Sequence, residues 1–188
     1  MNALRAPSLV LALALAAAGT WQVAQAAWIH GKAVLAQVLI ARAWRLADGR
    51  ETAPRPWPGA DLRPVARLSL PARGLQVLVL DAASPRALAF GPGVLDAGAG
   101  GRTVLVAHRD THFAFLRELV PGDDLELEAP RGTRVRYRVD ELRVVHQGDF
   151  GALDEAGAGS LVLVTCYPFD AVRPGTAWRY VVVAERIG

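Results

Sequence analysis

The sequence predicts a mainly β domain, a closed or nearly closed barrel, that follows an N-terminal hydrophobic helix. Two observations predict the barrel: from residue 65 onward the chain breaks into many short apolar segments, and turns rich in Gly and Pro separate them. A third observation predicts the helix, because residues 7–29 contain no charged side chain. The 188 residues are enough for one ordinary domain with an appendage.

The uncharged N-terminal stretch, residues 7–29, is long enough to span a bilayer with some tilt. A secretory signal peptide is the competing interpretation, since Ala24, Gln25 and Ala26 fit the small-residue cleavage pattern. We favour an uncleaved membrane anchor, because the apolar stretch continues past that site through Trp28. Under either interpretation the rest of the chain crosses the membrane, and the few flanking charges determine orientation only weakly.

The chain after this stretch divides again near its prolines. Apolar residues recur at four-residue spacing over residues 31–44, which indicates a helix. Residues 53–59 contain three prolines, cannot continue a helix and indicate an extended spacer. The predicted parts are a membrane anchor or signal segment at 1–30, a helix and Pro-rich spacer at 31–60, and a β domain at 61–188.

The elements of the β domain follow from alternation and turn signals. One short helix is expected over residues 111–119, where Phe115, Leu116 and Leu119 would share one side. Strands are expected over residues 65–70, 75–81, 103–108, 124–128, 135–145, 161–165 and 178–184. The turn signals between them lie at Pro71, 83–85, 91–93, 98–101, 121–122, Gly148 and 174–175.

The basic balance of the chain does not indicate a nucleic-acid partner. The net charge is +3 and the sequence pI about 9.6. The densest arginines, Arg134, Arg136 and Arg138, alternate with apolar residues, as on the solvent face of a strand. Without a dense basic block or interleaved aromatic side chains, we expect no nucleic-acid binding.

Cys166 is the only cysteine of the chain, so no disulfide can form within it. Apolar residues 161–164 lead up to it and Pro168 follows, which places the sulfur at the end of a buried strand. A thiol at such a place is either a small core residue or a nucleophile.

His108 follows the apolar run 104–107 and therefore also lies at the end of a predicted buried strand. His108 and Cys166 are thus candidates to meet at one mouth of the barrel. The spacing of His108 and His112 could suggest a zinc pair, but Arg109 stands where the metalloprotease pattern requires glutamate. Since one cysteine completes no four-ligand site, we expect no metal and no cofactor.

Arg179 is the better of two candidate cations after Cys166, the other being the loop residue Arg173. Both faces of the strand around Arg179 are apolar, so its charge is costly there unless an anionic group meets it, although an outward-facing arginine remains possible. In a trio with these residues, an imidazolium favours the thiolate and can return a proton to a leaving amine. The arginine can hold a developing oxyanion.

The chain resembles the sortase family in three blocks that together cover about residues 65–187. Residues 162–166, Val-Leu-Val-Thr-Cys, are similar to the Thr-Leu-x-Thr-Cys motif of that family. His108 begins a block with an aromatic-rich turn that ends in Leu-x-x-Gly-Asp at Asp123, and Arg179 follows Cys166 at the family's spacing. Two short runs resemble the class GN sortases of Gram-negative bacteria. They are residues 108–113, His-Arg-Asp-Thr-His-Phe, and residues 166–172, Cys-Tyr-Pro-Phe-Asp-Ala-Val.

This resemblance implies an eight-stranded sortase-type β-barrel with short helices and a membrane-associated cysteine transpeptidase. Cys166 would cleave an LPXTG-like C-terminal sorting signal through a thioacyl intermediate. His108 would protonate the departing amine, and Arg179 would steady the substrate and the oxyanion. The implied partners are a protein with such a signal, an amine acceptor and the membrane.

The resemblance also implies a single pass through the inner membrane, with the catalytic domain on the periplasmic side. Two features depart from the family pattern. Ala107 stands where many sortases have glycine, and residues 147–160, where family members recognise the sorting signal, are short and rich in Gly and Ala. The motif that is recognised therefore stays open.

Two other functions fit the same residues. One is a thiol hydrolase of the same fold that releases its substrate to water. The other is a non-enzymatic envelope β-barrel that binds a partner, with Cys166 as core packing.

Overall fold

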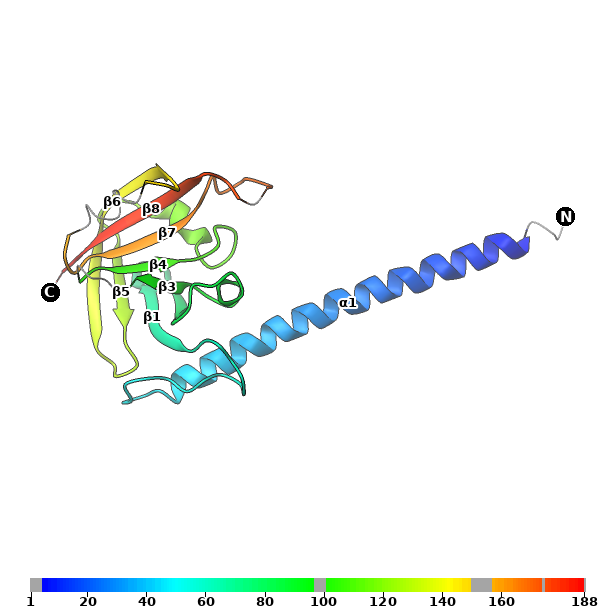
Figure 1. Ribbon diagram of the computed structural model, residues 1–188, viewed down its shortest axis with the longest axis horizontal. Helices are drawn as coiled ribbons and strands as arrows, with labels where there is room; N and C mark the ends of the chain where they lie inside the picture. Colours follow the sequence, from blue (N-terminus) through cyan, green and yellow to red (C-terminus); the bar gives the residue numbers. More distant parts are fainter. Residues whose placement is uncertain (1–4, 97–100, 150–156, 174, 188) are drawn as a thin grey trace. The chain divides into compact units, whose positions relative to one another are not determined.

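The helix α1 is continuous over Arg5–Arg45, so the predicted anchor and the predicted helix after it form one element (Figure 1). The computed structural model describes residues 5–96, 101–149, 157–173 and 175–187. Residues Val10–Arg45 have the length and apolar composition to cross a bilayer, a test that a signal sequence near the N-terminus passes as well. The chain divides into two compact units, Met1–Val38 and Leu39–Gly188.

The second unit is a closed eight-stranded barrel, which confirms the predicted fold class. Around the barrel the order is β1-β2-β3-β4-β7-β8-β6-β5, with β5 pairing back to β1. The adjacent strands β2 and β3 are parallel, as are β4 and β7, and the other pairs are antiparallel. The strands are β1 (Pro64–Leu70), β2 (Leu75–Leu80), β3 (Gly93–Asp96), β4 (Thr103–Val106), β5 (Asp124–Glu128), β6 (Arg134–His146), β7 (Leu161–Tyr167) and β8 (Trp178–Arg186).

Strand β3 lies where the sequence suggests only a turn. It forms because Gly93 comes close enough to β2 to pair with Leu80 in parallel register. A Cβ atom at Gly93 would lie 2.2 Å from the carbonyl oxygen of Ala82, so a side chain cannot be accommodated there without movement. The glycine that indicates a turn is therefore the residue that permits a strand pairing.

The helix expected over 111–119 is shorter and tighter than predicted. It is a 3-10 helix, η3, over Ala114–Glu118, and its Phe115 and Leu116 are buried in the barrel core. Leu119 is buried as well, directly after the helix ends. The expected apolar side is thus confirmed although the helix type differs.

Strands β4, β7 and β8 are apolar on both faces because each face contributes to a separate cluster. Leu105, Leu163 and Val182 belong to the main core, which draws residues from most strands of the barrel. On the other face a second cluster contains Val104, Val162, Val181 and Val183, with Val145 and Val164 packed against it. This second cluster, which we call the outer valine cluster, lies on the face that also carries the candidate site.

Residues 46–63, which we call the strap, lie on the barrel and include the stretch predicted as a spacer. Leu62 is almost inaccessible to solvent and packs in one cluster with Ile40 of α1 and Leu80 of β2. Trp57 meets Phe90 edge to face at a centroid distance of 5.7 Å. The three-part division of the chain stays a prediction, but its middle part contributes buried residues to the barrel unit.

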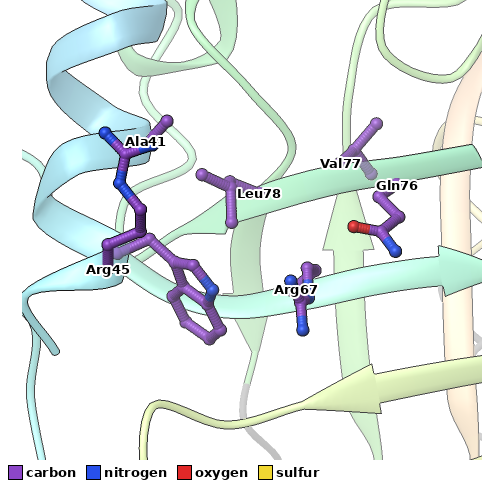
Figure 2. Close-up of a pocket in the computed structure, with 7 residues that line it drawn as sticks. Ala41, Arg45, Arg67, Gln76, Val77 and Leu78 are labelled. Atoms are coloured by element: carbon purple, nitrogen blue, oxygen red, sulfur yellow. The ribbon is translucent and has the colours of Figure 1, made fainter. Parts of the chain in front are cut away.

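A pocket of about 250 Å³ lies between the C-terminal end of α1 and strands β1 and β2 (Figure 2). The guanidinium of Arg67 lies over the Trp44 ring at 5.9 Å from its centroid and forms an ion pair with Glu128. Glu51 of the strap also forms an ion pair, with Arg131. The end of α1 and the strap therefore contact the barrel through polar side chains as well as apolar ones.

Candidate active site

Cys166 and Arg179 are direct partners on the antiparallel strands β7 and β8. Residues directly opposite on paired strands project to the same face. Because side chains alternate along β7, this face is the one that carries Val164 and the outer valine cluster. Cys166 is half-buried and its thiol is free, so the sulfur lies at a strand end, on the outer face of the barrel.

His108 reaches the same level of the sheet through the parallel pairing of β4 with β7. Val106, the last residue of β4, pairs with Val164, and the amide of Ala107 donates to the Val164 carbonyl over 3.3 Å. The hydroxyl of Thr165 donates to the Ala107 carbonyl over 2.7 Å, so the register continues beyond the end of β4. His108 and Cys166 are the next residues after Ala107 and Thr165 on these two segments. The imidazole of His108 is exposed.

The guanidinium of Arg179 is held by neutral oxygens. Its Nη1 donates to the carbonyls of Thr176 and Trp178, over 2.6 and 2.8 Å, and its Nη2 donates to the Gln147 side-chain oxygen over 2.9 Å. Within the described part of the chain these partners leave its charge without a neutralising carboxylate. Arg179 is therefore both fixed in place and electrostatically available to an anion beside Cys166.

A pocket of about 150 Å³ adjoins this arrangement on the outer face. Valines of the outer cluster form much of its lining, and His146, Gln147, Asp149 and Arg179 add polar groups. His146 and Trp178 are partners across β6 and β8, with ring centroids 5.5 Å apart. Part of the segment where a sorting signal would be recognised, residues 150–156, lies outside the described residues.

Comparison with known proteins identifies the family and the fold of the chain. A family model described as a sortase domain matches residues 68–187, a range that includes His108, Cys166 and Arg179. The chain belongs to the sortase family.

A curated relative is Sortase D of Bacillus subtilis (strain 168), which is 33% identical to this sortase over 88 residues. That match covers 46% of this chain and 43% of the relative, so the chain matches less than half of the relative's length.

Two solved structures share the sortase barrel. Sortase A from Corynebacterium diphtheriae has a TM-score of 0.60 at 24% identity, over 69% of this chain and 63% of the other. Sortase C-1 from Actinomyces oris has a TM-score of 0.57 at 25% identity, over 66% and 75% of the two chains.

Two residues of this sortase site are not indicated by its sequence. Arg109 is almost fully buried and donates to the β7–β8 loop, and Gln147 accepts from Arg179 at the end of β6. In the sequence, the position of Arg109 directly after His108 is the one feature that connects it with the site. No sequence signal distinguishes Gln147 from any other polar residue at a strand end.

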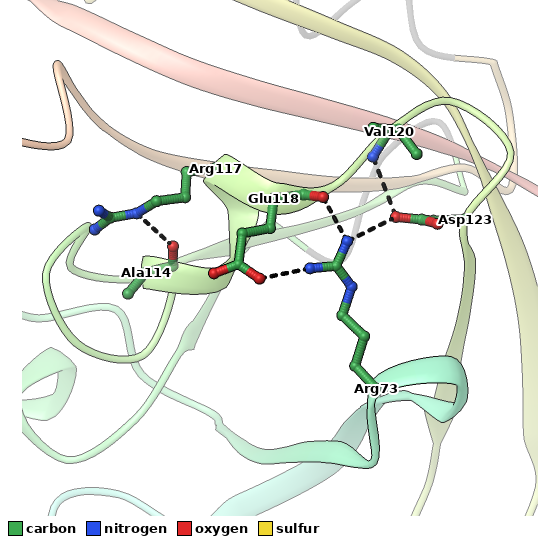
Figure 3. A network of polar contacts seen from close by, with 6 residues as sticks. All are labelled: Arg73, Ala114, Arg117, Glu118, Val120 and Asp123. Carbon is green, nitrogen blue, oxygen red and sulfur yellow. Dashed lines mark hydrogen bonds and ion pairs between the residues drawn. The ribbon is translucent and has the colours of Figure 1, made fainter.

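The segment that follows His108 is anchored to the barrel by Arg73 (Figure 3). The Arg73 guanidinium donates to Glu118 over 2.6 Å and lies 3.6 Å from the carboxylate of Asp123, which also accepts from the Val120 amide over 3.1 Å. This network holds η3 and the turn after it.

His112 lies in the same segment, four residues after His108. Burial lowers the pKa of His112, a backbone hydrogen bond with Ala89 opposes that shift, and the charge of a protonated His108 lowers the pKa further. Among the described residues, no group of three or more His, Cys, Asp or Glu side chains could hold a metal ion.

Proposed function

We propose that this sortase is a membrane-associated cysteine transpeptidase that cleaves an LPXTG-like C-terminal sorting signal and transfers the protein to an amine acceptor. The cross-strand pair of Cys166 and Arg179, with His108 at the end of the neighbouring strand, is the observation that carries the proposal. This arrangement supplies a nucleophile, a fixed cation and an exchangeable proton on one face of the barrel.

In the proposed reaction the Cys166 thiolate attacks the carbonyl carbon of the scissile peptide bond. The oxyanion that develops is stabilised by the Arg179 guanidinium. When the C–N bond breaks, protonated His108 gives its proton to the departing amine, which leaves a thioester on Cys166. An incoming amine then attacks the thioester, neutral His108 accepts its proton, and the C–S bond breaks to release the thiolate.

The apolar helix α1 supports the proposal of membrane association, because its composition and length suit a bilayer span. We place the chain as a single-pass protein of the inner membrane with its barrel on the periplasmic side. The motifs around His108 and Cys166 support assignment to class GN. The outer valine cluster would contact apolar side chains of the sorting signal.

The test is cleavage of a panel of sorting-signal peptides by the wild-type chain and by Cys166→Ala, with products followed by mass spectrometry. Cleavage should fall to background in the variant, while thermal unfolding shows an unchanged barrel. His108→Ala should also lower cleavage, because it removes the proposed proton donor, and His30→Ala, a substitution in α1, is its matched control. Undiminished cleavage by Cys166→Ala would overturn the proposal.

The same assay separates the alternative functions. With an added amine such as glycinamide, a transpeptidase yields ligated peptide, whereas a thiol hydrolase yields only the free acid. A binding module with Cys166 as packing would cleave nothing, and its thiol would resist a maleimide probe in the folded protein.

A further inference from the structure

We propose that Arg109 is a positioning residue of this site, which ties the loop between β7 and β8 to the segment carrying His108 and so fixes Arg179. The inference rests on the proposed function and concerns the geometry of the same three residues. It assigns a role to the one arginine of the region whose side chain is buried, with only 9% of its surface exposed.

Within the described residues, the side-chain hydrogen bonds of Arg109 reach one loop. Its Nη2 donates to the carbonyl oxygens of Ala171 and Arg173, over 2.6 and 3.0 Å. Its Nη1 donates to the Thr176 hydroxyl over 3.3 Å. These acceptors are spread over the β7–β8 loop, which follows Tyr167 and ends before Trp178, the neighbours of Cys166 and Arg179 in sequence.

Thr176 connects the two arginines. Its hydroxyl accepts from Arg109, and its carbonyl accepts from Nη1 of Arg179 over 2.6 Å. A displacement of the loop at Thr176 therefore removes one of the acceptors that orient the Arg179 guanidinium. Because Arg109 directly follows His108, the backbone of the candidate base and the orientation of the candidate cation are coupled through one side chain.

Arginine suits this task for reasons of geometry and charge. Its planar guanidinium offers several donors in a fixed fork, so one side chain can bind three acceptors in different directions. Lysine keeps the charge but presents a compact ammonium on a flexible stem. Removing the side chain would leave the carbonyls of Ala171 and Arg173 without this donor, and the loop would then move to find other partners.

We call the hydrogen bonds of Arg109 to the β7–β8 loop the clamp. Hydrogen exchange on the full-length protein tests the clamp without measuring activity. Arg109→Gln should accelerate exchange of the loop amides at 169–173 and 175–177, while the rest of the barrel keeps its protection. Arg173→Ala is the matched control, because it removes an exposed arginine of the same loop and leaves the accepting carbonyl in place. Unchanged loop exchange in Arg109→Gln overturns the proposal.

A double-mutant cycle tests whether Arg109 acts through Arg179. With a peptide that the wild type cleaves, Arg109→Gln should lower kcat by about 10- to 100-fold with little change in KM, as a small misplacement of reacting groups does. In an Arg179→Ala background the same substitution should lower kcat by less than about 3-fold. Effects that simply multiply would mean that Arg109 supports the fold alone and would overturn the coupling.

The remaining outcomes separate this inference from the proposed function. If Arg109→Gln does not fold, Arg109→Lys takes its place, with intermediate loop exchange and partial recovery of kcat expected. If the wild type cleaves no peptide, the proposed function fails and the exchange experiment alone decides whether the clamp exists. If the wild type cleaves peptide but loop exchange is unaffected by either variant, the clamp fails and the proposed function stands.

Discussion

At the scale of residues, the candidate site depends on groups at strand ends and on the neutral oxygens around them. Arg179 binds two carbonyls and one amide oxygen, and Arg109 binds two carbonyls and one hydroxyl. Neither guanidinium is neutralised by a carboxylate in the described chain. Arg179, the cross-strand partner of Cys166, therefore keeps the positive charge that an oxyanion requires.

The half-buried His112 makes stability depend on pH. Its pKa lies below the ordinary value of 6.5 in the folded chain, so the unfolded chain binds its proton more readily. We expect the free energy of unfolding to be highest above pH 6.5 and to fall as the pH decreases from there toward the folded-state pKa. Urea unfolding across this range measures the effect. In His112→Gln the loss of stability should be smaller, and an identical pH dependence would contradict this account.

The sequence predicted Cys166, His108 and Arg179 as candidates because strand ends and alternation can be recognised from neighbouring residues. The structure places Cys166 opposite Arg179 and brings His108 to the same level. Arg109 and Gln147 could not be found in this way. Their roles depend on backbone carbonyls and loop positions that exist only after distant segments have packed.

At the scale of elements, β3 should not tolerate a side chain at its first residue, Gly93. A Cβ atom at Gly93 would lie 2.2 Å from a backbone oxygen, so Gly93→Ala should lower the free energy of unfolding by about 2–3 kcal/mol. Gly157→Ala is the control, because a Cβ there meets nothing within 4 Å. Guanidinium unfolding of both variants tests the prediction, and equal midpoints would contradict it.

The elements with clear periodicity were predictable, and those made by tertiary contact were not. Alternation predicted β6 nearly to its ends, and an apolar run predicted β8 to within two residues of its end. β3 was missed because Gly91, Pro92 and Gly93 have the composition of a turn. The expected helix at 111–119 became a 3-10 helix, because periodicity indicates an apolar side without fixing the hydrogen-bond pattern.

At the scale of the whole molecule, the strap and the end of α1 before it should matter for stability although they lie outside the barrel strands. Ile40 and Leu62 are almost inaccessible to solvent in the barrel unit. A chain that begins at residue 64 loses both side chains, which should lower the free energy of unfolding by about 3–6 kcal/mol relative to a chain that begins at residue 39. Urea unfolding of the two chains measures this, and equal stabilities would contradict a structural role for residues 39–63.

The barrel itself could be predicted from many short strands, but the packing of the strap could not. Its prolines exclude a helix and say nothing about burial, while Ala53 and Ala60 are too small to mark a buried segment in the sequence. Composition therefore indicated a spacer where the folded chain has a covering layer. Orientation across a membrane likewise rests on a few flanking charges.

The pairing of β4 with β7 also bears on how the chain assembles. Cys166 and Arg179 meet through strands adjacent along the chain, whereas Ala107 and Thr165 are 58 residues apart. Bringing such distant segments together carries the larger loop-closure entropy, and contacts of this kind form slowly. We expect the thiol and the arginine to meet in a local hairpin first, and the histidine to arrive only when the parallel pairing forms. The nucleophile thus acquires its proposed proton donor as one of the last consequences of folding.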